Sequence, residues 1–306
     1  MDRNPIFFRK FAQRKAMPSY HKQRLARTIL SFREVRADKR SIVIIIKSTT
    51  VISKNKIKYI RSLDMKKNRK VSGMFVAEGH KLVGELLGHF GCTYIAATQE
   101  WLAENDELLR QPHMDRVEID EVSDDELQRA SLQEHPQQVL AIFRQRDEAT
   151  DINTVARENL CLMLDDVQNP GNLGTIVRLA DWFGIEHIFC SKGCADIYNP
   201  KTVQATMGGM ARVSVHYVDL AETLASLSTD IPVYGTFLDG DNIYEKTLLG
   251  HGVIIMGNEG NGVSDAVASH VNERLYIPNY PQGRDTSESL NVAIATAIIC
   301  AEFRRR

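Results

Sequence analysis

The sequence predicts a two-domain α/β protein whose larger, carboxyl-terminal domain is built on a parallel sheet. Its 306 residues are enough for two domains of ordinary size. From Ser53 onward, short apolar runs alternate with polar segments that are compatible with helices. Residues 160–164 form a continuous apolar run, which is typical of a strand buried on both faces of a parallel sheet.

Composition excludes several classes of protein. The chain is 25% charged and 43% hydrophobic, which excludes disorder, collagen and a coiled coil. Its longest aliphatic run, residues 42–46, is far shorter than the roughly 18–20 residues of a membrane-spanning helix, so no membrane partner is expected. Five cysteines form neither a CxxC pair nor a disulfide framework, which favours a cytoplasmic location. The scattered histidines and the pair Cys190 and Cys194 predict no metal site.

The net charge of −1 conceals a strong asymmetry. Residues 1–50 carry 13 Lys/Arg against 3 Asp/Glu, residues 51–80 carry 8 against 2, and the remainder has a net charge of −17. A basic end on an acidic body is typical of proteins that bind a polyanion such as nucleic acid. A basic helix that is only solvated is the alternative.

The first part of the chain is predicted to be a leader followed by a small domain. Residues 1–52 are Arg-rich and acid-poor, and we expect a disordered arm or a start codon assigned too far upstream, with Val51 as the alternative start. Residues 53–146 are predicted to be a smaller α/β domain. Its expected strands are residues 74–77, 92–97, 116–119 and 138–143. Its expected helices are residues 54–70, 79–89, 100–109 and 123–130.

The second part is predicted to be a polar linker followed by the larger domain. Residues 147–158 lack clustered β-branched residues and are predicted to be a linker or a solvated helix. Residues 159–306 form the second domain. Its expected strands are residues 160–164, 187–190, 212–216, 233–237, 252–256 and 274–277, and its final helix is residues 288–303.

The first stretch with candidate chemistry is LDDVQNPGNLGTIVRLADWFG, residues 164–184. Its loop predicts a helix that begins near Asn172, whose amide side chain is favoured at an N-cap. Arg178 lies about 200° around this helix from Ile176, away from the predicted buried stripe. A surface ion pair between Arg178 and Asp181 is the alternative to a functional role.

The second stretch is IIMGNEGNG, residues 254–262. Glycines directly after a buried strand allow the backbone to approach a ligand closely. The glycine order is neither that of a Rossmann dinucleotide site nor that of a P-loop. Glu259 either holds the loop through backbone N–H groups or takes part in the chemistry.

The third stretch is YIPNYPQGRDTSESLNV, residues 276–292. Polar groups at the start of the last helix either cap it or bind a ligand. Capping is the simpler role for Asp285 and Ser287. Asn291 is expected to lie deeper in the helix than a cap, which makes it the stronger functional candidate.

Taken together and in this order, the three stretches resemble the motifs of the SpoU (TrmH-like) RNA ribose 2′-O-methyltransferases of the SPOUT class. NPGNLGTIVRLADWFG, IIMGNEGNGVS and IPNYPQGRDTSESLNVAIATA carry the resemblance over residues 160–306. The segment SKNKIKYIRSLDMKKNRKVSGMFVAEGHKLVGELL is similar to the family's L30e-like amino-terminal substrate-binding domain. The loop at residues 279–288 is longer than the family's usual link, so a different entry to the pocket is expected.

The resemblance implies a trefoil knot in the parallel sheet, a homodimer with active sites completed across the interface, and S-adenosylmethionine as cofactor. By motif position, the residues that would line the cofactor pocket are Thr236, Phe237, Gly257, Ile277 and Leu290. The residues that match the family's catalytic and polar positions are Arg178, Asn172, Glu259, Ser289 and Asn291.

The resemblance also implies the reaction, which is methyl transfer to a ribose 2′-OH of RNA. Ribosomal RNA of the 23S type, and a guanosine within it, is the expected target. A tRNA 2′-O-methyltransferase and a non-catalytic RNA-binding protein of the same fold are the alternatives. A dinucleotide-dependent oxidoreductase is poorly supported, because NPGNLG stands where G-x-G-x-x-G would be needed.

Overall fold

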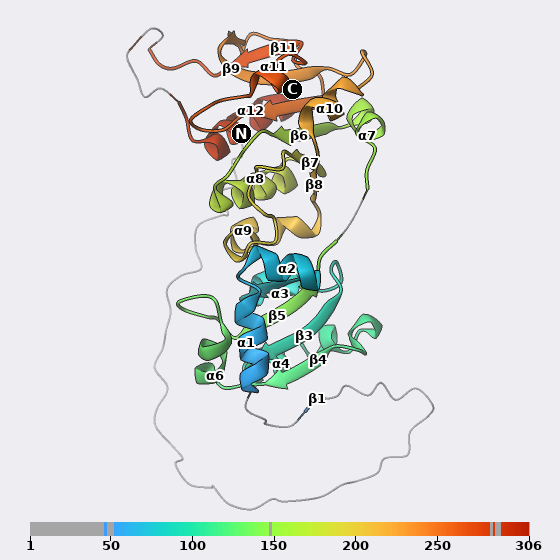
Figure 1. Cartoon of the computed structure of the whole chain (residues 1–306), viewed down its shortest axis with the longest axis vertical. Helices are drawn as coiled ribbons and strands as arrows, with labels where there is room; N and C mark the ends of the chain where they lie inside the picture. The colour runs from blue at the N-terminus through green and yellow to red at the C-terminus, as the bar shows by residue number, and fades with distance from the viewer. Residues whose placement is uncertain (1–45, 48–51, 147–148, 282–283, 285–288, 306) are drawn as a thin grey trace, which may run out of the picture. The chain divides into compact units, whose positions relative to one another are not determined.

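The computed structural model describes residues 46–47, 52–146, 149–281, 284 and 289–305 (Figure 1). Most of the predicted leader therefore lies outside the described residues, as do Val51 and the expected caps Asp285 and Ser287. Ile46–Lys47 forms a short strand, β1, which pairs in parallel with residues 119–120.

The amino-terminal domain is built on a five-stranded mixed sheet in the order β1-β4-β3-β5-β2. β5 runs antiparallel to β2 and β3, and β4 runs parallel to β3 and β1. The remaining strands are β2 (Met74–Glu78), β3 (Cys92–Ala97), β4 (Glu118–Glu121) and β5 (Val139–Arg144). The helices are α1 (Lys54–Ser62), α2 (Lys66–Ser72), α3 (His80–Leu86), α4 (Gln99–Glu104), α5 (Asp106–Leu109), the 3-10 helix η1 (Pro112–Met114) and α6 (Asp124–Ala130).

Two predicted helices of this domain are each divided in the structure. The basic helix expected over residues 54–70 ends at Leu63, whose side chain is buried, and restarts as α2 after Met65. The helix expected over residues 100–109 is broken at Asn105, whose side-chain amide donates to the carbonyl of Trp101 at 2.8 Å and competes with the helical backbone. β4 begins two residues later than expected, because Val117 N–H closes a turn on the Met114 carbonyl.

The carboxyl-terminal domain has a six-stranded sheet in the order β11-β9-β10-β6-β7-β8, and all of its described strand pairs are parallel. The prediction of a parallel sheet is therefore confirmed. The strands are β6 (Leu160–Leu164), β7 (His187–Cys190), β8 (Ser214–Tyr217), β9 (Val233–Asn242), β10 (Gly252–Met256) and β11 (Glu273–Tyr276). The helices are α7 (Ile152–Glu158), α8 (Pro170–Trp182), α9 (Pro200–Thr206), the 3-10 helix η2 (Gly209–Ala211), α10 (Leu220–Ala225), α11 (Asp265–Ala268) and α12 (Val292–Arg304).

β6 lies at the centre of this domain, and every residue of it is buried. Alternate side chains point to opposite faces of a strand. Leu160, Leu162 and Leu164 accordingly belong to the apolar cluster that contains α8 and α12. Cys161 and Met163 belong to the cluster that contains α7, α10 and α11. The sheet thus has helices on both faces, and the edge formed by the strands' carboxyl ends is left for a ligand.

Three boundaries of this domain's strands and final helix differ from the expectation by two or more residues. β8 starts two residues late because η2 precedes it, and β9 continues five residues further, to Asn242. α12 begins at Val292 and not at residue 288, because Asn291 is its N-cap. The trefoil knot that the resemblance implies stays a prediction.

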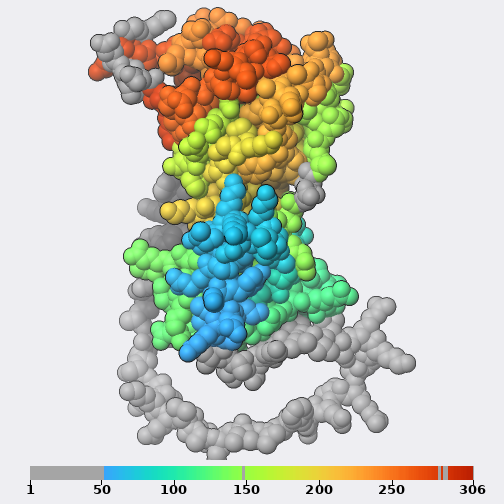
Figure 2. All heavy atoms as spheres, in the orientation of Figure 1, coloured from blue at the N-terminus to red at the C-terminus, as the bar shows by residue number. Residues whose placement is uncertain are grey.

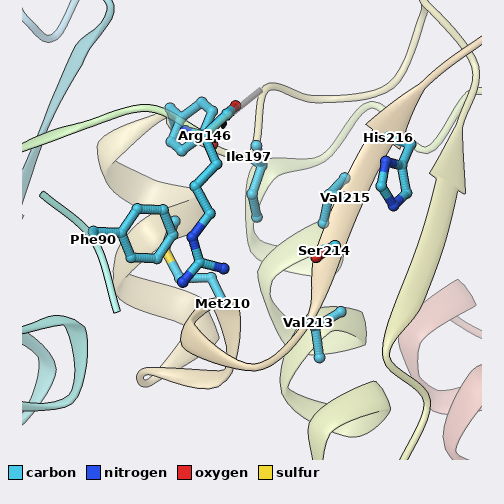
Figure 3. A pocket seen from close by; sticks show the side chains of 9 residues that line it. Phe90, Arg146, Ile197, Met210, Val213, Ser214, Val215 and His216 are labelled. Carbon is cyan, nitrogen blue, oxygen red and sulfur yellow. Dashed lines mark hydrogen bonds between the residues drawn. The ribbon is translucent and has the colours of Figure 1, made fainter. Parts of the chain in front are cut away.

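Arg146, which follows β5, adjoins a cavity of only about 30 Å³ (Figure 3). The Arg146 guanidinium lies 3.9 Å from the centre of the Phe90 ring and donates to the carbonyl of His89 at 2.7 Å. A cavity of this size holds one or two water molecules and no larger ligand. We therefore assign Arg146 a structural role.

Candidate active site

A cavity of about 390 Å³ lies at the carboxyl-terminal edge of the large sheet. It is lined by residues 236–238 of β9, 256–262 after β10, 275–277 at β11, and Ser289, Leu290, Val292 and Ala295 around the start of α12. All five residues that the resemblance assigned to cofactor binding, namely Thr236, Phe237, Gly257, Ile277 and Leu290, are among its lining residues. The volume is within the range of cofactor sites.

Residues 257–262, which we call the glycine loop, fold tightly back on themselves. Asn258 and Gly262 exchange two backbone hydrogen bonds of 2.9 Å. The Asn258 side chain also accepts from the N–H groups of Gly260 (2.9 Å) and Asn261 (3.1 Å). A Cβ atom on Gly257 would lie 2.3 Å from the carbonyl carbon of Gly262, so the loop can close only around a glycine.

The two aspartates after β6 fasten this loop to the sheet. The Asp165 carboxylate, 7% exposed, accepts from the N–H (2.8 Å) and the hydroxyl (2.7 Å) of Ser264. The carbonyl of Asp166 accepts from the Asn258 amide at 2.8 Å. Sequence reasoning gave no role to Asp165, Asn258 or Ser264. The available signal was a carboxylate directly after a buried strand, where an ionised group needs hydrogen-bond partners.

Four of the five predicted polar residues meet beside the cavity. The Asn172 amide donates to a carboxylate oxygen of Glu259. The Asn291 amide in turn donates to the Asn172 side-chain oxygen at 3.2 Å, and the Ser289 hydroxyl donates to the Glu259 carbonyl at 3.5 Å. Residues separated by up to 119 positions in the chain thus form one hydrogen-bond network. Glu259 belongs both to this network and to the cavity wall.

Two local expectations about this network were wrong. The N-cap of α8 is Asn169 and not Asn172, since Pro170 needs no N–H partner at the first helical position and Asn169 accepts from the N–H of Gly171 and Asn172. Asn172 therefore lies in the first turn, and its amide is free to reach Glu259. Asn291 caps α12 and accepts from the N–H of Ala293 and Ile294, so it does not lie deep in the helix.

Arg178 lies apart from the network. It is exposed on α8, six residues beyond Asn172, which corresponds to about 9 Å along the helix axis. The alternative ion pair with Asp181 is not formed, because both Asp181 oxygens accept from Arg212, at 2.7 and 2.8 Å. Within the part of the chain that the structure describes, Arg178 has no ion-pair partner. Its guanidinium is available to a group outside the chain.

The Cys194 side chain supports the loop before α8. The Cys194 thiol accepts from Val167 N–H at 3.2 Å and lies 3.2 Å from the Leu164 carbonyl. Hydrogen bonding to Cys190 lowers the pKa of Cys194 to about 7. Over the described residues, no three His, Cys, Asp or Glu side chains are grouped as a metal site would require. Nor does any described helix have the length and apolar character needed to cross a membrane.

A parallel sheet, a glycine-lined cavity at its carboxyl-terminal edge and a polar network on the cavity wall define a cofactor-dependent α/β enzyme. Comparison with known proteins makes this class specific. Residues 159–301 match the model of the SpoU rRNA Methylase family, and residues 54–141 match that of the MRM3-like substrate binding domain. The chain belongs to the SpoU rRNA methylase family.

Individual relatives agree with this assignment. The Bacillus subtilis 23S rRNA (guanosine(2553)-2′-O)-methyltransferase RlmP is 31% identical over 81% of this chain and 96% of its own length. A Porphyromonas gingivalis structure described as an RNA methyltransferase of the TrmH family is 41% identical, with a TM-score of 0.75 over 84% of this chain and 99% of the other. An AdoMet-bound rRNA methyltransferase from Sinorhizobium meliloti is 28% identical, with a TM-score of 0.73 over 84% and 97%.

Proposed function

We propose that this protein transfers the methyl group of S-adenosylmethionine to a ribose 2′-OH of ribosomal RNA, in the 23S-type molecule and at a guanosine. Membership of the SpoU family and the names of the relatives support the reaction and the type of RNA. The observation that carries the proposal is the position of Glu259, which joins the cofactor-sized cavity to the Asn172–Asn291 network. Cofactor and substrate groups would therefore meet at that wall.

The cavity fits S-adenosylmethionine in size and in the character of its walls. Leu290, Ile277 and Phe237 supply apolar surface, while the backbone of the glycine loop is open to close approach because Gly257 has no side chain. When bound, the cofactor supplies a sulfonium methyl group that is already a strong electrophile. The protein's own task is then to place the 2′-oxygen and to stabilise the charge that develops on it.

Arg178 is assigned the electrostatic part of this task. A guanidinium stays protonated in proteins, so it is a poor proton acceptor but a strong donor to phosphate or to a developing alkoxide. We propose that Arg178 binds the substrate phosphate and stabilises the alkoxide. Asn172, Glu259, Ser289 and Asn291 are proposed to hold the ribose and the glycine loop in place.

Because no hydrogen bond joins Arg178 to the network within the described residues, we propose that the protein is a homodimer in which a second copy supplies it. Exposed apolar side chains on α8 and α12 support this proposal. Trp182 is 83% exposed and Ile294 is 55% exposed, on two helices that pack against each other. Leu290, which lines the cavity, is exposed as well. Burial of this surface against a second copy would bring two active sites to the interface.

We also propose a function for each segment of the chain. Residues 53–146 bind the RNA, residues 147–158 connect, and residues 159–306 carry the reaction, with residues 1–52 as a basic leader. A 2′-OH acceptor selects RNA over DNA. A cytoplasmic location is proposed from the five cysteines, all of which are free thiols.

Two measurements test the proposal. S-adenosylmethionine should raise the melting temperature of the protein, and NAD should not, because only a ligand of the folded state stabilises it. Purified 23S rRNA lacking modification should then accept labelled methyl groups faster than unmodified tRNA. Stabilisation by NAD alone would contradict the cofactor assignment. Faster labelling of tRNA would favour the alternative substrate, and binding of both ligands without any transfer would favour a non-catalytic RNA-binding protein.

A further inference from the structure

The amino-terminal domain has an uneven charge distribution of its own. Residues 53–73, which form α1, α2 and their caps, contain eight Lys/Arg and one Asp. Residues 74–146, which form the rest of the domain, contain six Lys/Arg and fourteen Asp/Glu. The positive charge of the domain is therefore concentrated on one pair of helices.

Three of these eight cations are engaged within the protein. Lys56 pairs with Glu118 at 2.6 Å, and Arg69, which is buried, pairs with Asp196 at 2.6 Å. Arg61 donates to two backbone carbonyl groups at the end of α6. These contacts account for their positions on structural grounds alone.

The other five cations form what we call the lysine face, and all five are exposed. They are Lys54, Lys58, Lys66, Lys67 and Lys70. None of them forms an ion pair with any residue in the described ranges. Lys54 and Lys58, like Lys66 and Lys70, are one helical turn apart, so like charges repel along each helix. Figure 2 shows this segment, in blue, on the surface of the molecule.

Exposed apolar residues are next to these lysines in the sequence. Tyr59 is partly exposed, and Met65 and Val71 are more than half exposed. They come from α1, from the turn and from the end of α2, and the apolar residue Ile60 of α1 is buried in the domain. An amphipathic helix that lies on a membrane instead presents one continuous apolar face. Separated apolar side chains among lysines suit a nucleic acid, whose bases stack on aromatic rings while its phosphates pair with the lysines.

We propose that the lysine face is a docking surface for the phosphate backbone of the substrate RNA, with Tyr59 available to stack on an unpaired base. This inference rests on the proposed function, since it assigns to one surface the binding of that substrate. It makes a quantitative statement about salt dependence. Each phosphate contact contributes about 0.7 to 0.9 to the magnitude of the slope of log affinity against log salt concentration, so five contacts contribute about 3.5 to 4.5.

The test compares three variants of the full-length protein with the wild type. The lysine-face variant replaces all five residues with glutamine, which retains helix propensity and removes charge. A second variant carries Lys58→Gln and Lys67→Gln. Its matched control carries Lys81→Gln and Arg116→Gln, which removes two exposed charges elsewhere in the same domain. Affinity for ribosomal RNA is measured by filter binding between 50 and 200 mM salt, with circular dichroism and S-adenosylmethionine affinity as checks of folding.

The five-residue variant is expected to bind RNA at least tenfold more weakly and with a smaller salt slope, and the Lys58/Lys67 pair more weakly than the control pair. Wild-type affinity in the folded five-residue variant would overturn the inference. The inference would also be overturned if the five-residue variant lost binding to phosphatidylserine vesicles but kept its affinity for RNA, because the face would then be a membrane surface. If the wild type binds RNA through this face but transfers no methyl group, the proposed function fails while the docking surface stands.

Discussion

Replacing Gly257 with alanine places a methyl group where the backbone of the glycine loop already lies. The added Cβ would be 2.3 Å from the Gly262 carbonyl carbon and 2.5 Å from both the Gly262 oxygen and the Val263 nitrogen. Backbone atoms cannot rotate away as a side chain can, so the loop has to open. Overpacking of this kind costs about 1–3 kcal/mol. Because the loop is a wall of the cavity, we expect cofactor affinity to fall by about the same free energy, or roughly 5- to 150-fold.

The matched control is Gly260→Ala in the same loop. Its added Cβ would meet only the Asn258 side-chain oxygen, at 3.5 Å, which is an ordinary contact. Isothermal titration with S-adenosylmethionine should show a large loss for Gly257→Ala and little change for Gly260→Ala. Thermal unfolding should show a decrease of several degrees for the first variant only. Equal affinities for the two variants would refute the reasoning that loop closure around Gly257 forms the cofactor site.

Four further predictions each concern a single residue. Arg178→Ala should lower kcat/KM for methyl transfer at least a hundredfold, with Arg178→Lys less affected and cofactor affinity unchanged in both; equal activity of the alanine variant would remove Arg178 from the mechanism. Glu259→Ala leaves the Asn172 amide without its acceptor and should raise the free-energy barrier to methyl transfer by about 1–3 kcal/mol. Glu259→Gln keeps an oxygen at that position and should have a rate nearer that of the wild type in a steady-state assay. Trp182→Glu should convert the proposed dimer to a monomer in size-exclusion chromatography with light scattering, while Val71→Glu, at an apolar residue that is 82% exposed, should not. Burial raises the pKa of Glu78 in the folded state above its ordinary value of 4.5. The folded state therefore holds the proton more tightly than the unfolded state, and the free energy of unfolding falls as the pH rises from 4.5 to the higher pKa of the folded state. Urea titrations across that pH range should show this fall in the wild type and not in Glu78→Gln.

Much of the fold could be predicted from local pattern. The strands 92–97, 160–164, 187–190 and 252–256 have the bounds expected from their apolar runs. Element ends were less predictable, because they depend on side-chain hydrogen bonds that periodicity does not encode. The side chain of Asn105 breaks a helix, and Asn169 with Pro170 starts α8 three residues before the expected position.

Only part of the candidate site could be predicted from the sequence, because the contacts between its motifs depend on the fold. The resemblance pointed to Asn172, Glu259, Ser289 and Asn291 as separate motif positions, but the hydrogen bonds among them depend on the order of the strands in the sheet. The place of Asp165 after a buried strand was visible in the sequence, but its partner Ser264 was not, because the two residues are 99 positions apart. The position of Arg178 outside the network is likewise a consequence of the three-dimensional structure. It is the main support for the dimer proposal.

The most direct test of the central claim is the chemical position of the transferred methyl group. Unmodified 23S rRNA is incubated with the protein and labelled S-adenosylmethionine, and the product is hydrolysed in alkali. Cleavage of an RNA linkage needs the neighbouring 2′-OH, so a ribose 2′-O-methyl group leaves an alkali-resistant dinucleotide. We predict that the label is found in such dinucleotides. Label in mononucleotides would show methylation of a base and would contradict the account.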